Sequence, residues 1–360
     1  MKRTARYSTL FAALVTLAGS ASAQSSVTVG GVVDLAARSV NNSNGTLRSL
    51  ASGSNSTSRL VFRGTEDLGD GLRAGFWLEG SLAADTGTAG TGAQFWDRQA
   101  TVSLSGRWGE VRAGRDWTPV YYGFVFGDPW TNVGVGSGSN FLNASVATVY
   151  QRAFGSALNP TTLSRSSNAL EYWLPAGLGG LYGHLMVAPS ENSNATGGFR
   201  YEAARVGYKG AGFDAAVYAG ATKIAAADAS LKQMGVYGSY TIAGSTALMA
   251  SITNSEYLSS KHTHFMGGVR ATLGLWMLKA SYNRLDQKGT NAAGVSIDGN
   301  DASQWALGAD YPLSKRTVLY TSVARLNNKA TAAFAIPGGP GFAAAGSSST
   351  GYEAGLRHSF

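Results

Sequence analysis

The sequence predicts an all-β fold in which an antiparallel sheet closes into a barrel that crosses a membrane. Charged residues are only 14% of the chain, whereas soluble proteins carry about 25%. Several segments alternate apolar and polar residues with a period of two, which is typical of strands. No segment beyond residue 23 approaches the ~18 apolar residues of a spanning helix. In lipid only helices and closed β-barrels satisfy the hydrogen bonds of every backbone group. Since the sequence offers no spanning helix, it predicts a barrel.

The N-terminus has the pattern of an export signal. Cations in residues 2–6 precede the apolar run 10–17 and an Ala-Ser-Ala motif at 21–23, the order of a cleaved signal peptide. We expect residues 1–23 to be the signal peptide and 24–360 the barrel domain. A membrane-anchoring helix is the alternative, but the run is shorter than the ~20 residues needed to span a bilayer.

Composition supports the barrel and excludes a nucleic-acid partner. Glycine accounts for 48 of 360 residues, about twice the ordinary share of ~7%. The chain has no cysteine, although exported small folds often depend on disulfides. The signal carries three cations and no acid, so the mature net charge is 8 − 3 = +5. This excess is mild, and no long basic run suggests nucleic-acid binding.

Alternation is clearest in the segments 276–283, 304–313 and 351–360. Each has one largely apolar face, and aromatic residues lie near the segment ends. This pattern fits a face that contacts lipid between two aromatic girdles. A soluble β-sandwich also alternates, but its strands are usually shorter and its polar face more charged.

Seven tight turns divide the chain into pairs of strands. Glycine, proline and small residues mark them, at 69–71, 106–109, 175–180, 210–212, 243–245, 273–275 and 312–316. Most intervals hold two strands of ~9–11 residues and a longer polar loop. Seven turns and two terminal strands predict 7 × 2 + 2 = 16 strands, with short periplasmic turns and long external loops.

One interval is longer than the others. Between 109 and 175 the expected strands 111–117 and 164–174 leave roughly 45 residues of loop, a length that is usually functional or disordered. We expect this third loop to fold into the lumen and narrow it. The alternative is a mobile external loop.

Several stretches carry a resemblance to a known family: SVTVGGVVDL (26–35), SRLVFRGTEDLGDG (58–71), FWLEGSLAAD (76–85), RQATVSLSGRWGEVRAGR (98–115), LGADYPLSKRT (307–317) and the C-terminus through Phe360. With these stretches the chain resembles the general porins of Gram-negative bacteria, especially the β-proteobacterial branch. The resemblance spans the whole mature chain. Gly30 departs from it, because the family often carries an aromatic residue there, which leaves the packing of the first strand open.

The resemblance implies a passive, water-filled channel for small hydrophilic solutes and ions in the cell outer membrane. The expected assembly is a homotrimer of 16-stranded barrels, surrounded by outer-membrane lipid and lipopolysaccharide. Phe360 resembles the family's C-terminal signal for the assembly machinery. The resemblance also implies wall arginines that face acidic groups across a constriction.

Alternation places several charged side chains in the lumen. Arg59 and Arg63 share one face of their strand, while Leu60 and Phe62 share the other. An arginine facing lipid would cost roughly 2–4 kcal/mol at mid-membrane, so the arginines should face inward. The same reasoning directs Arg165 and Glu79 inward.

Arg98 gives conflicting signals. By alternation it lies on the same strand face as Ala100, Val102 and Leu104. If this apolar face is the outer one, Arg98 would point outward. The resemblance places the matching arginine inside, and we follow the resemblance. The outer face of this strand would then be polar, which would suit a subunit contact.

These positions define a hypothesis for the pore. We expect a constriction with Arg59, Arg98 and Arg165 on one side, Arg63 nearby, and Glu79 and Asp128 as the opposing charge. Such a field would favour anions. A weaker expectation is that Arg115 and Asp116 pair across the base of the long loop.

Other chemistry is less well supported. His262 and His264 share a strand face, but Arg270 on the same face would repel a cation, so we expect no metal and no cofactor. No nucleophile or phosphate-loop motif is present, which speaks against an enzyme.

A substrate-specific channel with an aromatic ladder is a closer alternative, although only Trp77 and Trp173 have inward parity. An adhesin acting through the loop 326–346 is another.

Overall fold

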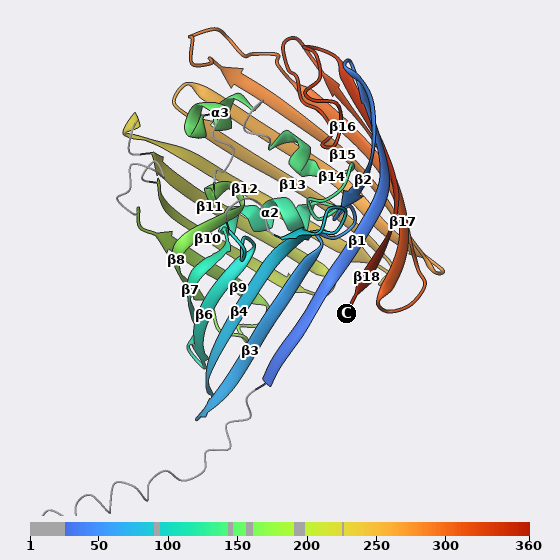
Figure 1. The fold of residues 1–360 in the computed structure, drawn as a ribbon. Coiled ribbons are helices and arrows are strands. Elements are labelled where there is room, and N and C mark those ends of the chain that lie inside the picture. The colour runs from blue at the N-terminus through green and yellow to red at the C-terminus, as the bar shows by residue number, and fades with distance from the viewer. Residues whose placement is uncertain (1–25, 90–93, 143–146, 156–160, 191–198, 225–226) are drawn as a thin grey trace, which may run out of the picture.

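The computed structural model describes residues 26–360, apart from 90–93, 143–146, 156–160, 191–198 and 225–226. Its strands form one antiparallel sheet that closes on itself (Figure 1). Closure is made by the first and last strands, which pair from Val32 with Ser359 to Asn41 with Thr350. The predicted all-β barrel is confirmed, and the predicted signal peptide lies outside the described residues.

The described part of the chain has eighteen strands and four short helical segments. The strands are β1 (Ser26–Asn42), β2 (Gly45–Ser52), β3 (Arg59–Gly69), β4 (Leu72–Ala83), β5 (Thr88–Ala89), β6 (Gln99–Gly106), β7 (Gly109–Trp117), β8 (Arg165–Trp173), β9 (Leu181–Ala188), β10 (Phe199–Gly210), β11 (Phe213–Ile224), β12 (Ala229–Ile242), β13 (Thr246–Tyr257), β14 (Ser260–Leu273), β15 (Trp276–Gly289), β16 (Ala302–Pro312), β17 (Thr317–Asn328) and β18 (Ser348–Ser359). The helical segments are α2 (Pro119–Gly127), η1 (Gly138–Phe141), α3 (Thr148–Phe154) and α4 (Thr161–Ser164).

These elements make 16 wall strands. The two-residue β5 belongs to a loop. Strands β2 and β3 both pair with β1, along its second and first halves, so together they form one interrupted wall strand. In the described chain the count is therefore 18 − 1 − 1 = 16, as predicted.

All seven predicted turns join neighbouring strands at the same end of the barrel. They connect β3 to β4, β6 to β7, β8 to β9, β10 to β11, β12 to β13, β14 to β15 and β16 to β17. Several need left-handed backbone, for example Ala211 at φ 49° and Ala243 at φ 48°, each followed by a glycine of positive φ. These seven turns lie at the periplasmic end, and the long third loop leaves from the opposite end, where the connections vary in length down to the two residues 258–259.

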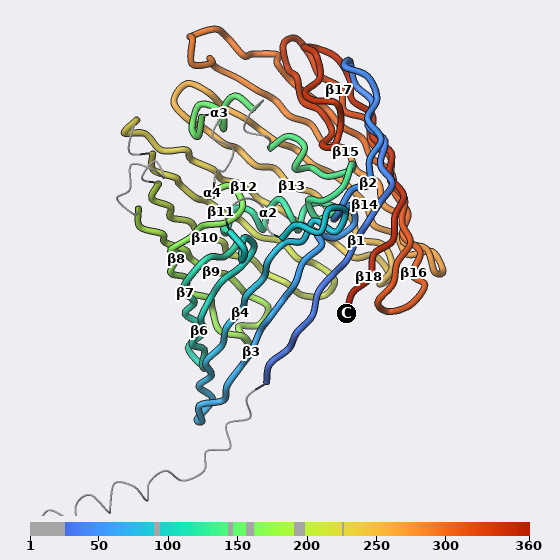
Figure 2. Tube along the Cα trace, in the orientation of Figure 1, coloured from blue at the N-terminus to red at the C-terminus, as the bar shows by residue number. Residues whose placement is uncertain are grey.

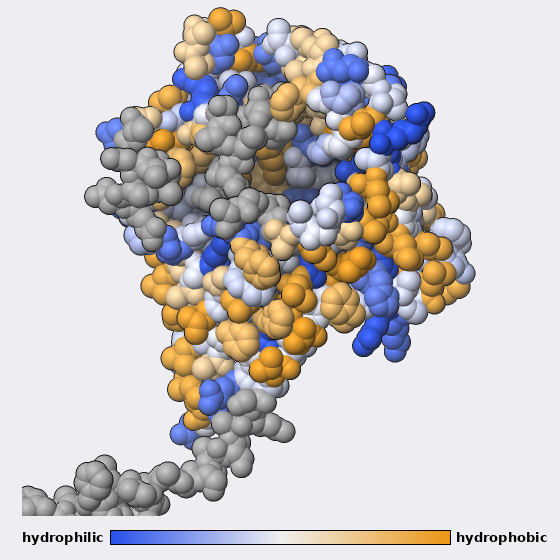
Figure 3. Space-filling model, viewed as in Figure 1, coloured by the Kyte–Doolittle hydropathy of each residue, from blue (hydrophilic) through white to orange (hydrophobic). Residues whose placement is uncertain are grey.

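The outer wall is apolar across its middle. Leu185, Val217, Leu248, Tyr282 and Leu307 are all about half exposed, although they lie within regular strands. Figure 3 shows such residues gathered over the wall between the two ends. No helix in the described residues is long and apolar enough to span a bilayer.

The break between β2 and β3 is an inward bend, which we call the 53–58 bend. The carboxylate of Asp34 accepts backbone N–H groups of Asn55 at 2.7 Å and Ser56 at 2.6 Å. Arg38 donates to the hydroxyl of Ser54 at 2.7 Å. Since these partners lie on the lumen side of β1, the bend is held inside the barrel.

The described parts of the third loop, residues 118–164, fold into the barrel as predicted; we call this segment the lumen loop. Its apolar side chains would be costly in water, and many are buried, among them Val120, Phe124, Trp130, Phe141 and Tyr150. Burial of each such side chain contributes roughly 1.5–3 kcal/mol. Helix α2 lies against β10–β13 and helix α3 against β13 and β14, and Figure 2 shows this green trace within the barrel.

Glycine lets α2 approach the wall closely. A Cβ on Gly123 would lie 2.1 Å from the ring of Tyr218. The helix begins with Thr118, whose side chain accepts from the backbone N–H of Tyr121 at 3.3 Å, and Pro119 follows. This is a favourable helix start, and it turns the chain inward directly after β7.

The C-terminus completes the sheet beside β1. Backbone hydrogen bonds of 3.1 Å join Gly31 and Phe360 in both directions. The Phe360 ring covers Gly31, where an added Cβ would lie 2.6 Å from a ring carbon and 2.6 Å from the carbonyl oxygen of Arg59. At Gly30 an added Cβ would lie 3.1 Å from the Phe360 carbonyl oxygen. The Phe360 ring thus lies on the outer wall against Gly31, next to Gly30, where the family often carries an aromatic residue.

We predict that Gly31→Val prevents efficient barrel closure, because the new side chain meets both main chain and the Phe360 ring. The measurement is the fraction of refolded protein with heat-modifiable electrophoretic mobility. Gly267→Val is the matched control, since a Cβ there meets nothing within 4 Å. Equal folding of the two variants would show that the Gly31–Phe360 contact does not limit closure.

Candidate functional site

The lumen loop covers one half of the inner wall and leaves the other half free for charged side chains. Four of the arginines on this free half come together: Arg59 begins β3, Arg98 precedes β6, Arg115 lies in β7, and Arg165 begins β8. We call these four residues the arginine cluster. The strands that carry them are neighbours in the sheet through β4, so the barrel itself brings them together.

Glu79 of β4 lies at the centre of the arginine cluster. Its Oε1 is 2.5 Å from Nε of Arg98 and 3.4 Å from Nε of Arg59. Arg165 donates from Nε to the backbone carbonyl of Arg98 at 2.8 Å, and its guanidinium lies 5.7 Å from the Trp117 ring centre. Three strands and the residue before β6 thus converge on one patch.

Asp97 is a second carboxylate that sequence reasoning missed. It accepts from the backbone N–H and the hydroxyl of Ser81 at 2.7 and 2.6 Å. Its backbone carbonyl accepts from Nε of Arg115 at 2.7 Å, and Arg115 also donates to Ser167 at 2.9 Å. Asp97 lies in a long loop just before a strand, where alternation gives no signal for its direction.

The cluster keeps a positive excess. Among the described residues it contains four guanidinium groups and the nearby carboxylates of Glu79 and Asp97. Asp116 also lies next to the cluster, but it pairs with Arg112 and this pair adds no net charge. The local balance is therefore 4 − 2 = +2. In a narrow lumen such charge acts on every passing ion, since the Debye length is about 8 Å at physiological ionic strength.

The expected opposition of charges across the lumen is not what the structure shows. Glu79 lies among the arginines on the same wall. Asp128 is fully buried inside the lumen loop, where its carboxylate accepts backbone N–H groups of Trp130 at 2.8 Å, Asn132 at 3.0 Å and Gly138 at 3.0 Å. Burial raises the pKa of Asp128. The hypothesis of Asp128 as an opposing pore charge is thus wrong in geometry, because the carboxylate organises its own loop.

Arg98 faces the lumen, and the strand that follows has an apolar outer face. Arg98 lies in a bend before β6, so strand alternation does not extend to it. Within β6, Val102 and Leu104 are exposed on the outside, at 61% and 41%, and Thr101 is buried. The expected polar outer face is wrong, and it gives no argument for a subunit contact.

Arg63 and the residues at the base of the loop lie nearer the periplasmic end. The Arg63 guanidinium is 5.1 Å from the Trp77 ring centre. Arg63 and Arg112 line a cavity of 390 Å³. Arg112, not Arg115, pairs with Asp116, at 2.5 Å, so the expected Arg115–Asp116 pair is wrong.

The histidines support the packing of the lumen loop. The ring centre of His262 lies 5.3 Å from Tyr150, and that of His264 lies 6.0 Å from Phe124. Among the described residues no group of three or more His, Cys, Asp or Glu side chains could hold a metal ion. Trp173 stacks on His184 at 3.8 Å, so it is held against the wall.

These features define the class of the protein. A closed barrel of 16 wall strands, with an apolar outside and a charged, loop-narrowed inside, is a channel-forming protein of the bacterial outer membrane. A family model described as Gram-negative porin matches residues 9–331. The chain therefore belongs to the Gram-negative porin family, and it forms a passive channel in the outer membrane.

Individual relatives agree. Outer membrane porin protein 32 of Delftia acidovorans is 33% identical over 97% of this chain and 98% of its own length. A solved structure of an anion-selective porin from Comamonas acidovorans has a TM-score of 0.80 and 31% identity, and the match covers 93% of this chain and all of that one. OmpT of Vibrio cholerae shares the fold, with a TM-score of 0.68 at 13% identity over 93% of this chain and 98% of its own.

We predict that Asp128→Ala loosens the lumen loop, because three backbone N–H groups lose a charged acceptor worth about 1.5–3 kcal/mol per bond. Cleavage of the folded barrel by a protease should increase within the loop, and open-channel current noise should rise. Asp228→Ala is the control, since Asp228 is an exposed loop carboxylate paired with Lys223. Wild-type noise and protease resistance in Asp128→Ala would contradict this role.

Proposed function

We propose that this porin is an anion-preferring diffusion channel for small hydrophilic solutes and ions, with no enzymatic activity. The observation that carries the proposal is the unbalanced arginine cluster on the free half of the inner wall. The lumen loop narrows the passage opposite this wall, so a solute must pass close to the cluster. The similar porin from Comamonas acidovorans is described as anion-selective, which supports the same direction of preference.

Selectivity follows from simple electrostatics. A unit charge about 4 Å from another interacts with roughly 1 kcal/mol in water, and the low-dielectric wall around a narrow lumen strengthens this field. The attraction is enough to enrich anions and deplete cations without trapping an ion. Ions pass through a channel rapidly only when each binding site holds them weakly.

The nearest alternative is a substrate-specific channel. Such a channel would bind its solute saturably in a lined track, whereas Trp173 is stacked against His184 rather than standing free. The named relatives are porins, which supports a channel over a barrel enzyme or an adhesin. Conductance proportional to salt concentration would favour general diffusion over a specific track.

The assembly is proposed from the family. We propose a homotrimer in outer-membrane lipid and lipopolysaccharide, and one structurally similar protein, OmpT of Vibrio cholerae, is described in a trimer form. We further propose that residues 1–23 are removed on export and that Phe360 is read by the assembly machinery. The position of Phe360, on the outer wall beside the closing strand pair, is accessible to such a partner.

We predict that Arg59→Ala, Arg98→Ala and Arg165→Ala each lower the ratio of anion to cation permeability, by up to about fivefold per charge. The measurement is the reversal potential of single channels in a planar bilayer under a KCl gradient. Arg200→Ala is the control, because Arg200 pairs with Glu202 on the exposed outer face of β10. Unchanged selectivity in all three variants, or cation selectivity in the wild type, would overturn the assignment.

We predict that conductance appears in groups of three equal steps, because each inserted trimer brings three barrels. The mass of the detergent-solubilised complex, measured by light scattering, gives an independent count. A mass of one chain together with isolated single steps would reject the trimer and leave the channel function intact.

A further inference from the structure

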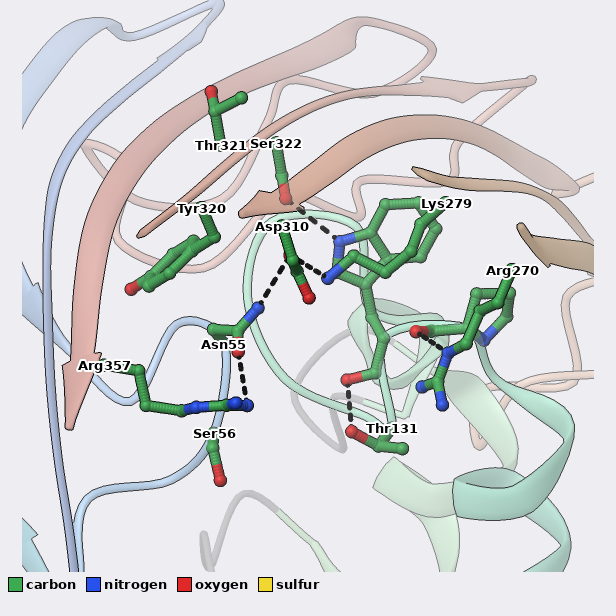
Figure 4. A network of polar contacts seen from close by, with 12 residues as sticks. Asn55, Ser56, Thr131, Arg270, Lys279, Asp310, Tyr320, Thr321, Ser322 and Arg357 are labelled. Atoms are coloured by element: carbon green, nitrogen blue, oxygen red, sulfur yellow. Dashed lines mark hydrogen bonds and ion pairs between the residues drawn. The ribbon is translucent and has the colours of Figure 1, made fainter. Parts of the chain in front are cut away.

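A second basic surface lies in the lumen, below the lumen loop and apart from the arginine cluster. Four strands near the closing point of the barrel contribute to it (Figure 4): Arg270 from β14, Lys279 from β15, Asp310 from β16 and Arg357 from β18. They line a cavity of 530 Å³ together with Asn55 of the 53–58 bend, Thr131 of the lumen loop and Lys315 of a periplasmic turn. We call this cavity the vestibule site.

The vestibule site opens to the lumen and toward the periplasm. Its strand residues share inward parity with buried neighbours, as Arg270 does with His264 and Lys279 with Ser281. Residues of two periplasmic turns, Gly274 and Ser314, complete its lining. A ligand that reaches it is therefore a solute in the channel, not a lipid headgroup on the outer wall.

Charge in the vestibule site is strongly unbalanced. The lining contains Arg270, Lys279, Lys315 and Arg357 against the single carboxylate of Asp310, a balance of 4 − 1 = +3. Asp310 already pairs with Lys279 at 2.9 Å. The two guanidinium groups contribute most of the remaining charge.

Neutral acceptors hold both guanidinium groups in place. Arg270 donates to the backbone carbonyls of Pro129 at 2.7 Å and Asp128 at 3.3 Å. Arg357 donates from Nη1 to the side-chain oxygen of Asn55 at 2.7 Å, while its buried Nε has no hydrogen-bond partner among the described residues. Asp128 and Asp310 lie near Arg270, and Asp34 lies near Arg357, but in the described chain none of these carboxylates accepts a hydrogen bond from the two guanidinium groups. The groups are oriented in advance and keep donors for a ligand, which favours binding.

We propose that the vestibule site binds small oxyanions, inorganic phosphate among them, as a second station after the arginine cluster. Guanidinium groups present paired N–H donors that match two oxygens of one oxyanion. A halide offers one atom to both donors, whereas an oxyanion offers a separate oxygen to each, so the site should prefer oxyanions over chloride. This goes beyond the general anion preference proposed above, which needs only the sign of the charge.

The 53–58 bend connects the two stations. Arg59 donates to the hydroxyl of Ser56 at 3.0 Å and to the carbonyl of Thr57 at 2.8 Å, whereas Asn55 accepts from Arg357 and donates to Asp310 at 3.1 Å. Consecutive residues of the bend thus contact one station each. An anion leaving the arginine cluster would meet the vestibule site next.

The test is block of single-channel chloride current by inorganic phosphate added to the periplasmic side. In wild-type protein we expect a saturable reduction of current. Arg357→Gln and Arg270→Gln should each raise the half-blocking phosphate concentration by about fivefold, the factor expected from one charge at contact distance. Arg200→Gln, on the outer face, should leave it unchanged. Heat-modifiable mobility verifies folding, and if one vestibule variant does not fold, the other decides the test.

The variants also separate this proposal from the general one. Arg59→Ala should reduce chloride-over-potassium selectivity while saturable phosphate block persists. Absence of saturable block in the wild type, or block unchanged in both vestibule variants, would overturn the second station even where chloride selectivity is normal. Loss of phosphate block in Arg357→Gln with rescue in Arg357→Lys would show that charge suffices and would overturn the paired-donor geometry.

Discussion

The hydrogen-bonded closure of β1 on β18 is the constraint on which the rest of the structure depends. In lipid an unpaired backbone group costs several kcal/mol, so the sheet has no stable form with a free edge. Closure fixes which side chains face lipid and which face the lumen. It also sets the C-terminal residue beside Gly31, so that the last side chain added to the chain covers the seam.

A barrel of this size would be a wide water-filled tube, and the lumen loop changes that. Its apolar residues cover the inner wall of β10–β14 and also pack against β16 and β17. At the level of the loop, water and solutes are therefore confined to the uncovered half. Polar anchors fix the loop, including Asn140 to Gln304 at 2.7 Å and Val135 to Glu353 at 3.1 Å. The arginines lie on the uncovered half. The loop that narrows the channel therefore also directs solutes past its positive charge.

Alternation and turn residues predicted the strand number, the turn positions and the inward direction of Arg59 and Glu79, because a period of two leaves a strand residue no other choice. The directions of side chains outside the strands could not be predicted in this way. Arg98 lies one residue before its strand, Asp97 lies in a loop, and Asp128 belongs to a loop whose burial depends on contacts with distant strands. The 53–58 bend had no signal either, since its partner Asp34 lies on the neighbouring strand and acts through backbone hydrogen bonds.

The same physical device recurs at three lumen arginines. Arg165 is held by the carbonyl of Arg98, Arg115 by that of Asp97, and Arg270 by that of Pro129. A carboxylate would orient a guanidinium equally well but would cancel its charge, whereas a carbonyl dipole orients it and leaves the charge for the solute. A channel must attract anions and also release them. Guanidinium groups that already donate to a carbonyl suit this need, because each binds an anion only weakly and a second basic site lies farther along the lumen.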